Sequence, residues 1–212
     1  MRGALRCALL PAAVLVLGST ATKPVQANTV HYLHIFATNG GFADHPGVLL
    51  TLETWQQGEL ACFEFSNEST IDLAVAGVFF EQGPLTAFDS LLEGPGTQFS
   101  WPASQEDLPG GNTLIPPFDT WFSAGAAPPP SESGINPGES VTFLFEMSEG
   151  ITVREIGYQL ANGDVRVGAH VIGFPDGSSE SAVTAPEPST GLLLLAGLYL
   201  TWSPRRRNAE AV

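Results

Sequence analysis

Turns rich in glycine, proline and asparagine divide the middle of this chain into short segments. The 212 residues include 23 glycines and 17 prolines, and the segments between the turns are rich in β-branched and aromatic residues. Several segments alternate apolar with polar side chains, which is typical of a strand with one buried and one solvated face. The pattern predicts an all-β protein, either an antiparallel β-sandwich with long Pro/Gly-rich loops or, as the alternative, a small barrel.

The expected elements can be given as residue ranges. Strands are predicted at residues 32–36, 48–54, 60–66, 71–80, 98–101, 141–147 and 165–174. Residues 86–92 form a further strand or a short helix, and residues 102–138 form a long proline-rich loop, of a kind that is functional or flexible more often than neutral. Thr152 and Glu155 have the spacing of a capping box, which predicts one short helix over residues 152–161.

The N-terminal segment predicts a secretory signal peptide. Two arginines within the first six residues give a basic start, an apolar run follows over residues 8–17, and small residues stand at the −3 and −1 positions before Asn28. Residues 1–27 are therefore expected to form a signal helix that directs export through the Sec translocon. Cleavage is predicted between Ala27 and Asn28, with Ala21 as a weaker site.

A second processing signal is predicted near the C-terminus. Pro186, Glu187 and Pro188 precede an uncharged segment, Gly191–Trp202, which predicts a single transmembrane helix. This segment is followed by a basic membrane stop, which is expected to stay on the cytoplasmic side and consists of Arg205, Arg206 and Arg207.

The predicted transmembrane segment is short. From Ser189 to Pro204 it has 16 residues, and such a helix is about 24 Å long against roughly 30 Å of hydrocarbon. Snorkelling arginines or local thinning of the bilayer could cover the difference, and a temporary anchor needs no more. A buried terminal helix of the soluble domain is the alternative interpretation.

This order of signals closely resembles the PEP-CTERM sorting tail of exported Gram-negative bacterial proteins. The resemblance implies that residues 186–207 are the sorting tail, that residues 208–212 are a short end, and that residues 28–185 are the exported domain. It also implies that the tail holds the precursor in the inner membrane until an exosortase recognises and cleaves it. The protein would then reach the cell surface or the exopolysaccharide layer.

Parts of the central domain also resemble a recurring group of PEP-CTERM exported proteins. The matching segments are residues 63–67, 108–112, 116–118, 134–140 and 166–174. This resemblance extends over most of the chain, but it implies no reaction and transfers no catalytic residue.

The central domain is strongly acidic. Between Asn28 and Ala185 there are 20 acidic residues, and the only lysines or arginines are Arg154 and Arg166, so the formal charge is −18. Such a surface repels nucleic acid and anionic lipid, and no nucleic-acid partner is expected. The charge is compatible with divalent cations or basic partners, but its main expected consequence is solubility.

Sequence motifs assign no catalytic residue, metal or cofactor. The G-x-S-x-G, H-E-x-x-H, Walker A and G-x-G-x-x-G patterns are absent. His31 and His34 lie three residues apart on an expected strand, where they face opposite sides, so a metal pair is disfavoured against ordinary polar or edge positions. Acidic residues at 106–107 and 176–180 could offer oxygen ligands to Ca²⁺, but they match no recognised calcium loop, and solvated acidic loops are the preferred interpretation.

Cysteine chemistry is predicted to be unimportant. If Cys7 leaves with the signal peptide, Cys62 is alone in the mature domain and cannot form an intrachain disulfide. It lies in a predicted strand, so we expect a buried and inert thiol, with an intermolecular bridge or a nucleophile as alternatives.

Aromatic residues in or near loops are the candidate ligand-binding residues. Trp101 and Trp121, together with Trp55, Phe118 and Phe122, could form a surface on which sugar rings stack. The alternative interpretation is that these rings anchor loops or belong to the core.

Two classes of function are compatible with the sequence. The first is an exported, non-enzymatic protein of the cell surface or the exopolysaccharide, and exopolysaccharide is then a candidate partner. The alternative is a secreted hydrolase or lyase that acts on polysaccharide and requires paired carboxylates in a groove. With 20 acidic residues in the central domain a chance pair is expected, and the sequence therefore nominates none.

Overall fold

The structure, a computed structural model, describes residues 28–39, 41 and 45–184. The predicted signal helix at residues 1–27 and the predicted tail, with Pro186, Glu187, Pro188 and the three arginines, lie outside the described residues. Among the described residues, no helix combines the length and the apolar character needed to cross a bilayer.

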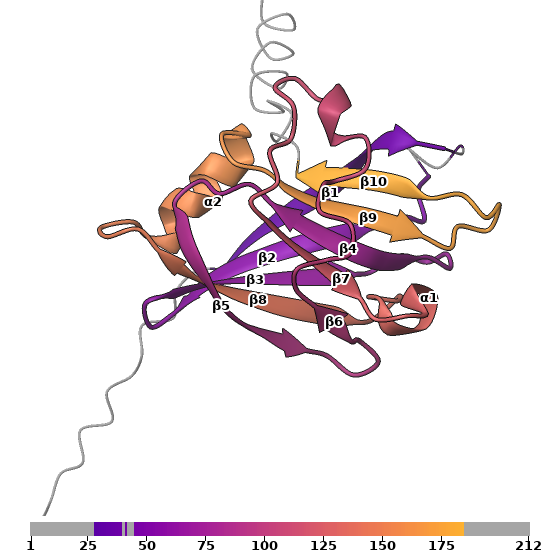
Figure 1. Cartoon of the computed structure of the whole chain (residues 1–212), viewed down its shortest axis with the longest axis horizontal. Coiled ribbons are helices and arrows are strands. Elements are labelled where there is room, and N and C mark those ends of the chain that lie inside the picture. Colours follow the sequence, from indigo (N-terminus) through magenta and orange to yellow (C-terminus); the bar gives the residue numbers. More distant parts are fainter. Residues whose placement is uncertain (1–27, 40, 42–44, 185–212) are drawn as a thin grey trace, which may run out of the picture.

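Within the described residues, ten strands form one continuous antiparallel sheet, and Figure 1 shows their arrangement. In chain order they are β1 (Thr29–Thr38), β2 (Leu50–Gln57), β3 (Leu60–Asn67), β4 (Ala74–Phe80), β5 (Leu85–Glu93), β6 (Phe99–Ser100), β7 (Phe122–Ala126), β8 (Ser140–Met147), β9 (Val167–Ile172) and β10 (Glu180–Thr184). Their spatial order is β5-β8-β3-β2-β1-β10-β9-β4-β7-β6. The prediction of an all-β, antiparallel fold is confirmed.

Strand β1 belongs to both halves of this sheet. Its first part pairs with β2, in a register that sets His31 opposite Leu52, and its second part pairs with β10. The register with β10 shifts between Ile35 and Ala37, which marks an irregularity of the β-bulge type. Because one strand serves two sets of partners, the sheet is continuous where the predicted sandwich would have two separate sheets, and it curls into a nearly barrel-shaped fold.

Phenylalanine side chains fill the space between the two halves. Phe80 of β4 lies with its ring centroid 5.4 Å from Phe63 of β3 and 4.8 Å from Phe145 of β8. Phe63, Phe80 and Phe145 are each at most 1% exposed. Full burial of such a side chain stabilises the fold by about 1.5–3 kcal/mol, and edge-to-face ring pairs add to it. Strands from both halves therefore share one core.

Helix α2 (Val153–Asn162) lies beside one end of the strands (Figure 1). Its N-cap is Thr152, whose side chain accepts a hydrogen bond from the Glu155 backbone N–H, as the capping-box spacing predicts. Ile156 and Leu160 are at most 1% exposed and join the phenylalanine core. Val153 and Gly157 are also buried, so the helix covers the core at this end with one face.

The predicted proline-rich loop contains more structure than expected. Within residues 102–138 the structure places the short helix η1 (Gly111–Thr113), strand β7 and helix α1 (Pro130–Ser133). Strand β7 pairs with β4, so the prediction of one uninterrupted loop is wrong. Strand β10 was also not predicted; all five of its residues are buried.

Residues 102–121 lie against the outer face of β7, β9 and β1. Strand glycines make room for them: a methyl group added at Gly168 of β9 would approach Leu108 to 2.6 Å, and one added at Gly125 of β7 would lie 3.3 Å from Ala103. Leu108 is only 4% exposed. We refer to residues 102–121 as the covering segment.

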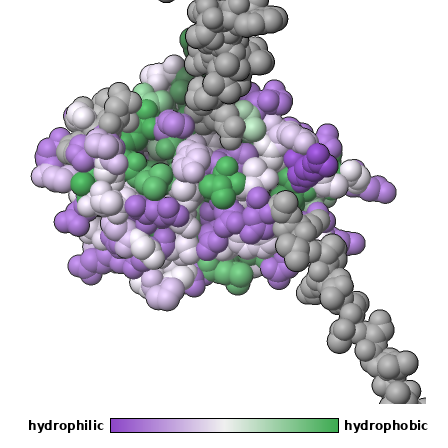
Figure 2. Space-filling model, turned by 180° about the vertical axis from the view of Figure 1, so that it is seen from behind, coloured by the Kyte–Doolittle hydropathy of each residue, from purple (hydrophilic) through white to green (hydrophobic). Residues whose placement is uncertain are grey.

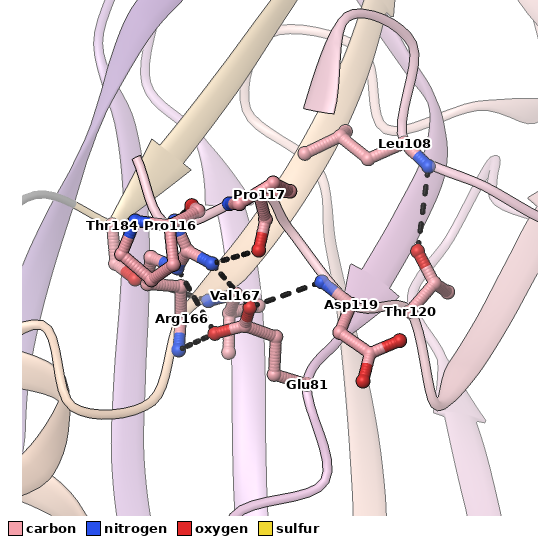
Figure 3. A network of polar contacts seen from close by, with 9 residues as sticks. All are labelled: Glu81, Leu108, Pro116, Pro117, Asp119, Thr120, Arg166, Val167 and Thr184. Atoms are coloured by element: carbon pink, nitrogen blue, oxygen red, sulfur yellow. Dashed lines mark hydrogen bonds and ion pairs between the residues drawn. The ribbon is translucent and has the colours of Figure 1, made fainter. Parts of the chain in front are cut away.

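A buried ion pair fixes the covering segment (Figure 3). The Nε of Arg166 donates to Glu81 Oε2 at 3.0 Å. Its two terminal nitrogens donate to the carbonyl oxygens of Pro116, at 2.7 Å, and Pro117, at 2.8 Å. Glu81 Oε1 accepts from the Asp119 backbone N–H at 3.1 Å. Proline has a carbonyl acceptor but no backbone N–H donor, so a proline-rich segment offers few donors of its own. Arg166 supplies the donors for the carbonyl groups of Pro116 and Pro117.

Candidate functional site

A cavity of about 420 Å³ lies between α2 and the strands β1 and β2. Its lining combines aromatic, basic and small residues: Thr29, His31, Trp55, Gln56, Thr152, Val153, Arg154, Gly157, Tyr158 and Ala161. We call it the α2 cavity. Its volume falls in the range typical of small-molecule sites, and a mostly apolar wall with a few polar groups is their usual composition.

Helix periodicity accounts for one wall of the α2 cavity. Val153, Gly157 and Ala161 are four residues apart, as are Arg154 and Tyr158, so each set forms a row along the helix surface. The absence of a side chain at Gly157 leaves room between α2 and β1, since an added methyl group would be 3.5 Å from Thr29 Oγ1.

Tyr158 holds the guanidinium group of Arg154. The Nε and one terminal nitrogen of Arg154 donate to the Tyr158 hydroxyl oxygen at 3.2 and 2.9 Å. The Arg154 Cζ lies 5.5 Å from the centroid of the same ring, within the range of a cation–π contact. An arginine has five N–H donors, so donors remain for a ligand after both of these bonds have formed.

The charge of the α2 cavity differs from that of the domain around it. Among the described residues that line it none is acidic, and Arg154 is the one lysine or arginine. The other arginine of the domain, Arg166, is 8% exposed and forms an ion pair with Glu81. Arg154 is therefore the accessible arginine of the described chain, and it lies at this cavity.

A neighbouring cavity of about 350 Å³ is acidic. Glu59, in the turn between β2 and β3, and Glu149, between β8 and α2, both line it, and Gln56 lines both this cavity and the α2 cavity. Both carboxylates belong to exposed residues. They are one pair of carboxylates that the hydrolase alternative could use.

Of the tryptophans predicted to bind a ligand, Trp55 lines the α2 cavity, whereas Trp101 and Trp121 lie elsewhere. Trp101 is 56% exposed and its ring centroid is 5.2 Å from Phe88, while Trp121 is half-buried and 5.9 Å from Phe145. Phe88 stacks on Phe122 at 4.7 Å, which connects the two tryptophans through a row of rings. Neither Trp101 nor Trp121 is among the described residues that line the α2 cavity. Their geometry is that of rings anchored on the core, with one face of Trp101 accessible.

The histidines of β1 do not form a pair. His31 is 5% exposed and lines the α2 cavity, whereas His34 is exposed, which agrees with the expectation that residues three apart on a strand face opposite sides. Within the described ranges, no three His, Cys, Asp or Glu residues are grouped so that they could hold a metal ion.

The acidic stretch at residues 176–180 is part of a turn and a strand. Asp176 accepts a hydrogen bond from the Ser178 backbone N–H at 2.9 Å, and hydrogen bonds from Ser178 lower the pKa of this carboxyl. Glu180 is 1% exposed at the start of β10, where its Oε1 accepts from the Ser178 hydroxyl at 3.2 Å. These acids are thus engaged within the turn.

His170 lies beneath the covering segment. It lines one cavity of about 190 Å³ with Ala103 and another of about 130 Å³ with Gly110 and Glu180. Burial lowers the pKa of His170 below its ordinary value of 6.5. Alternation along residues 165–174 predicts His170 on the solvent-facing side or at a sheet edge. The structure differs: β9 lies between β10 and β4, and the covering segment packs on its outer face, so His170 is half-buried.

Cys62 is buried in β3. Burial raises the pKa of its thiol to about 11, against a smaller opposing effect of a hydrogen bond with Gln57. The thiol is therefore protonated at neutral pH and a poor nucleophile, as the expectation of an inert cysteine requires.

Figure 2 shows the face opposite to that of Figure 1, where hydrophobic residues form several separate groups among hydrophilic ones. Comparison with protein-family models, with curated proteins and with solved structures finds no match for this chain.

The α2 cavity was not predicted from the sequence. Its residues come from three elements that are distant along the chain, and Trp55 was grouped with other tryptophans that lie elsewhere. One usable signal was present: Arg154 and Tyr158 are four residues apart on the helix predicted over residues 152–161, in a domain with only two lysines or arginines.

Proposed function

We propose that this protein is an exported, non-enzymatic protein of the cell surface or the exopolysaccharide. In this proposal an exosortase recognises Pro186-Glu187-Pro188 and cleaves the tail. The precursor is held in the inner membrane through Gly191–Trp202 and the three arginines that follow.

The order of signals in the sequence carries the proposal. A basic and apolar N-terminal segment ends in a cleavage site, and a Pro-Glu-Pro motif, an apolar segment and a basic stop follow the acidic domain in that order. The described fold is compatible with cleavage at both sites. Its first strand begins at Thr29 and its last ends at Thr184, so removal of residues 1–27 and 186–212 would take away no described strand.

The charge of the domain supports an extracellular rather than a nucleic-acid-associated role. A formal charge of −18 between residues 28 and 185 disfavours binding to nucleic acid or to anionic membrane surfaces. It favours a dispersed, soluble domain once the tail has been removed.

Intact-mass analysis of the protein released from the surface of its host tests the proposal. We expect a mass that corresponds to a chain beginning near Asn28 and ending near Pro186. Replacement of Pro186 and Pro188 by alanine should keep the protein in the membrane fraction with its tail attached, whereas replacement of Ser203, beyond the motif, should leave release unchanged. Surface-released protein that still contains Arg205–Arg207 would contradict tail cleavage.

The hydrolase alternative rests on Glu59 and Glu149, because both line one cavity. Inverting glycosidases hold their carboxyl groups about 6.5–9.5 Å apart and retaining enzymes about 5–5.5 Å apart. Turnover of host exopolysaccharide by the protein, abolished in Glu59→Gln and in Glu149→Gln, would replace the non-enzymatic proposal. Absence of turnover in the unaltered protein would remove the alternative.

A further inference from the structure

We propose that the α2 cavity binds a sugar residue that carries a carboxylate, with Arg154 pairing the carboxylate and the rings of Trp55 and Tyr158 contacting the sugar. The inference rests on the proposed function, because it names the class of extracellular ligand that an exopolysaccharide-associated protein would meet. The cavity, however, can be tested without any processing of the chain.

The charge of the residues that line the α2 cavity favours a ligand with an anionic group. A domain with 20 acidic residues has two arginines, and the accessible one lies at the α2 cavity, where no described lining residue is acidic. The screening length is about 8 Å at physiological ionic strength, so distant acids act weakly on a ligand in contact with the guanidinium group. For a ligand inside the cavity, Arg154 is therefore the one charged lysine or arginine that the described lining offers.

The same charge balance argues for a carboxylate and against a polyphosphate. Arg154 is the one lysine or arginine among the described lining residues, so any additional negative charge on a ligand would enter the cavity without a partner. Two donors of Arg154 are used by the Tyr158 hydroxyl, and the remaining N–H groups can form the parallel pair of bonds that a carboxylate accepts. Because Tyr158 already positions the guanidinium group, less side-chain entropy is lost on binding.

The walls of the cavity suit a ring with an apolar face and a polar edge. Trp55 projects from β2 and Tyr158 from α2, and both belong to the lining of a space of about 420 Å³. Aromatic side chains offer large, rigid contact surfaces, while Gln56 and Thr152 add hydrogen-bonding groups at the same cavity. A sugar acid combines these requirements in one residue.

Titration calorimetry with two matched trisaccharides tests the inference. The full chain, kept in detergent micelles, is titrated with a glucuronate trisaccharide and with the corresponding neutral glucose trisaccharide. We expect the charged trisaccharide to bind more tightly. Arg154→Gln should weaken its binding roughly 10- to 100-fold, the loss expected for a charge-assisted hydrogen bond, and leave the affinity for the neutral compound unchanged.

Matched variants separate the cavity from general effects. Glu132→Gln, on the exposed helix α1 at the other end of the molecule, changes the net charge by one unit and should leave both affinities unchanged (Figure 1). Trp55→Ala should weaken binding of both trisaccharides, whereas Trp101→Ala, outside the cavity, should not. Tyr158→Phe keeps the ring and removes the hydroxyl group, so it should reduce the preference for the charged compound.

Three results would overturn the inference: no binding of the charged trisaccharide, equal affinity for both compounds in the unaltered protein, or unchanged affinity in Arg154→Gln with unchanged melting temperature. None of them depends on cleavage of the tail. A precursor that is processed normally but fails these titrations would refute the cavity's role alone, and one that binds but keeps both ends would refute the sorting proposal alone.

Discussion

The two arginines of the acidic domain show how surroundings decide what a charge does. Arg166 is 8% exposed, bonded to Glu81 and to two proline carbonyls, and its Cζ lies 5.4 Å from the ring of Phe118. Arg154 lies on an exposed helix surface and bonds only to a tyrosine hydroxyl among the described contacts. The first holds a segment of chain in place, while the second keeps donors available at a cavity.

The comparison extends to the regions around these residues. On the covering-segment side, strand glycines and proline carbonyls bring the chain into close contact, and the spaces left are about 130 and 190 Å³. On the α2 side, a helix glycine leaves a space of about 420 Å³. Glycine thus permits close packing in one region and an open cavity in the other. Stability should be sensitive to substitution in the first region and tolerant in the second.

The largest difference is expected between Glu81→Ala and Arg154→Gln. Loss of Glu81 leaves the guanidinium group of Arg166 buried without its counter-ion, which should lower the free energy of unfolding by about 3–5 kcal/mol. Arg154→Gln should change it by no more than about 0.5 kcal/mol, as for most surface substitutions. Urea unfolding monitored by tryptophan fluorescence measures both. Similar losses in the two variants would remove the distinction between the arginines.

A smaller loss is expected from Gly168→Ala. The new methyl group would lie 2.6 Å from Leu108, so the covering segment must shift, at a cost on the order of 1–3 kcal/mol. Limited proteolysis should then cleave within residues 102–121 sooner than in the unaltered protein. Shortening Leu108 to alanine in the same chain should recover part of the loss. A double variant whose loss equals the sum of the two single losses would show that these residues do not meet.

His170 should make stability depend on pH on the covered side. Its pKa is lowered below 6.5 by burial, so the unfolded chain binds a proton more readily than the native protein. The free energy of unfolding should therefore fall as the pH drops below 6.5, and His170 should contribute no slope above that value. Urea unfolding at a series of pH values measures this slope. His170→Gln should reduce it, and His34→Gln, at an exposed position, should not.

The smallest effect, and one of opposite sign, is expected from Gly157→Ala. The added methyl group would meet Thr29 at 3.5–3.7 Å, an ordinary contact distance. Alanine is favoured over glycine within a helix, so the free energy of unfolding should rise by up to about 1 kcal/mol. Thermal unfolding measures the change. A destabilised Gly157→Ala would mean that α2 packs on β1 more tightly than an open cavity allows.

Local patterns in the sequence predicted most of the sheet. Alternation over residues 141–147 and 165–174 identified β8 and β9. The strands predicted at residues 48–54 and 60–66 correspond to β2 and β3, which pair with each other. Strands β7 and β10 were not predicted because their sequences have little of the composition typical of strands. Residues 122–126 consist of small side chains after one phenylalanine, and β10 begins with Glu180, which reads as part of an acidic turn.

The candidate site could not be predicted in the same way. Whether a tryptophan or an arginine is accessible depends on pairing between distant strands and on where the helix packs, which local spacing does not encode. Trp101 and Trp121 were grouped as candidates because they lie in or near loops, but the structure places Trp101 against Phe88 and Trp121 against Phe145, away from the α2 cavity. Two arginines of equal formal charge became distinguishable only once Glu81 and the proline carbonyls were located around one of them.

Because β1, the first strand, pairs with β10, the last described strand, the sheet can form only when both are present. Leu33 of β1 pairs with Thr184 of β10. The strand that joins both halves of the sheet therefore pairs with a segment at the end of the described chain. A chain shortened before Glu180 would leave β1 and β9 with bare backbone groups, which invite proteases and self-association. The last strand of the described chain thus closes a gap in the middle of the sheet, between β1 and β9.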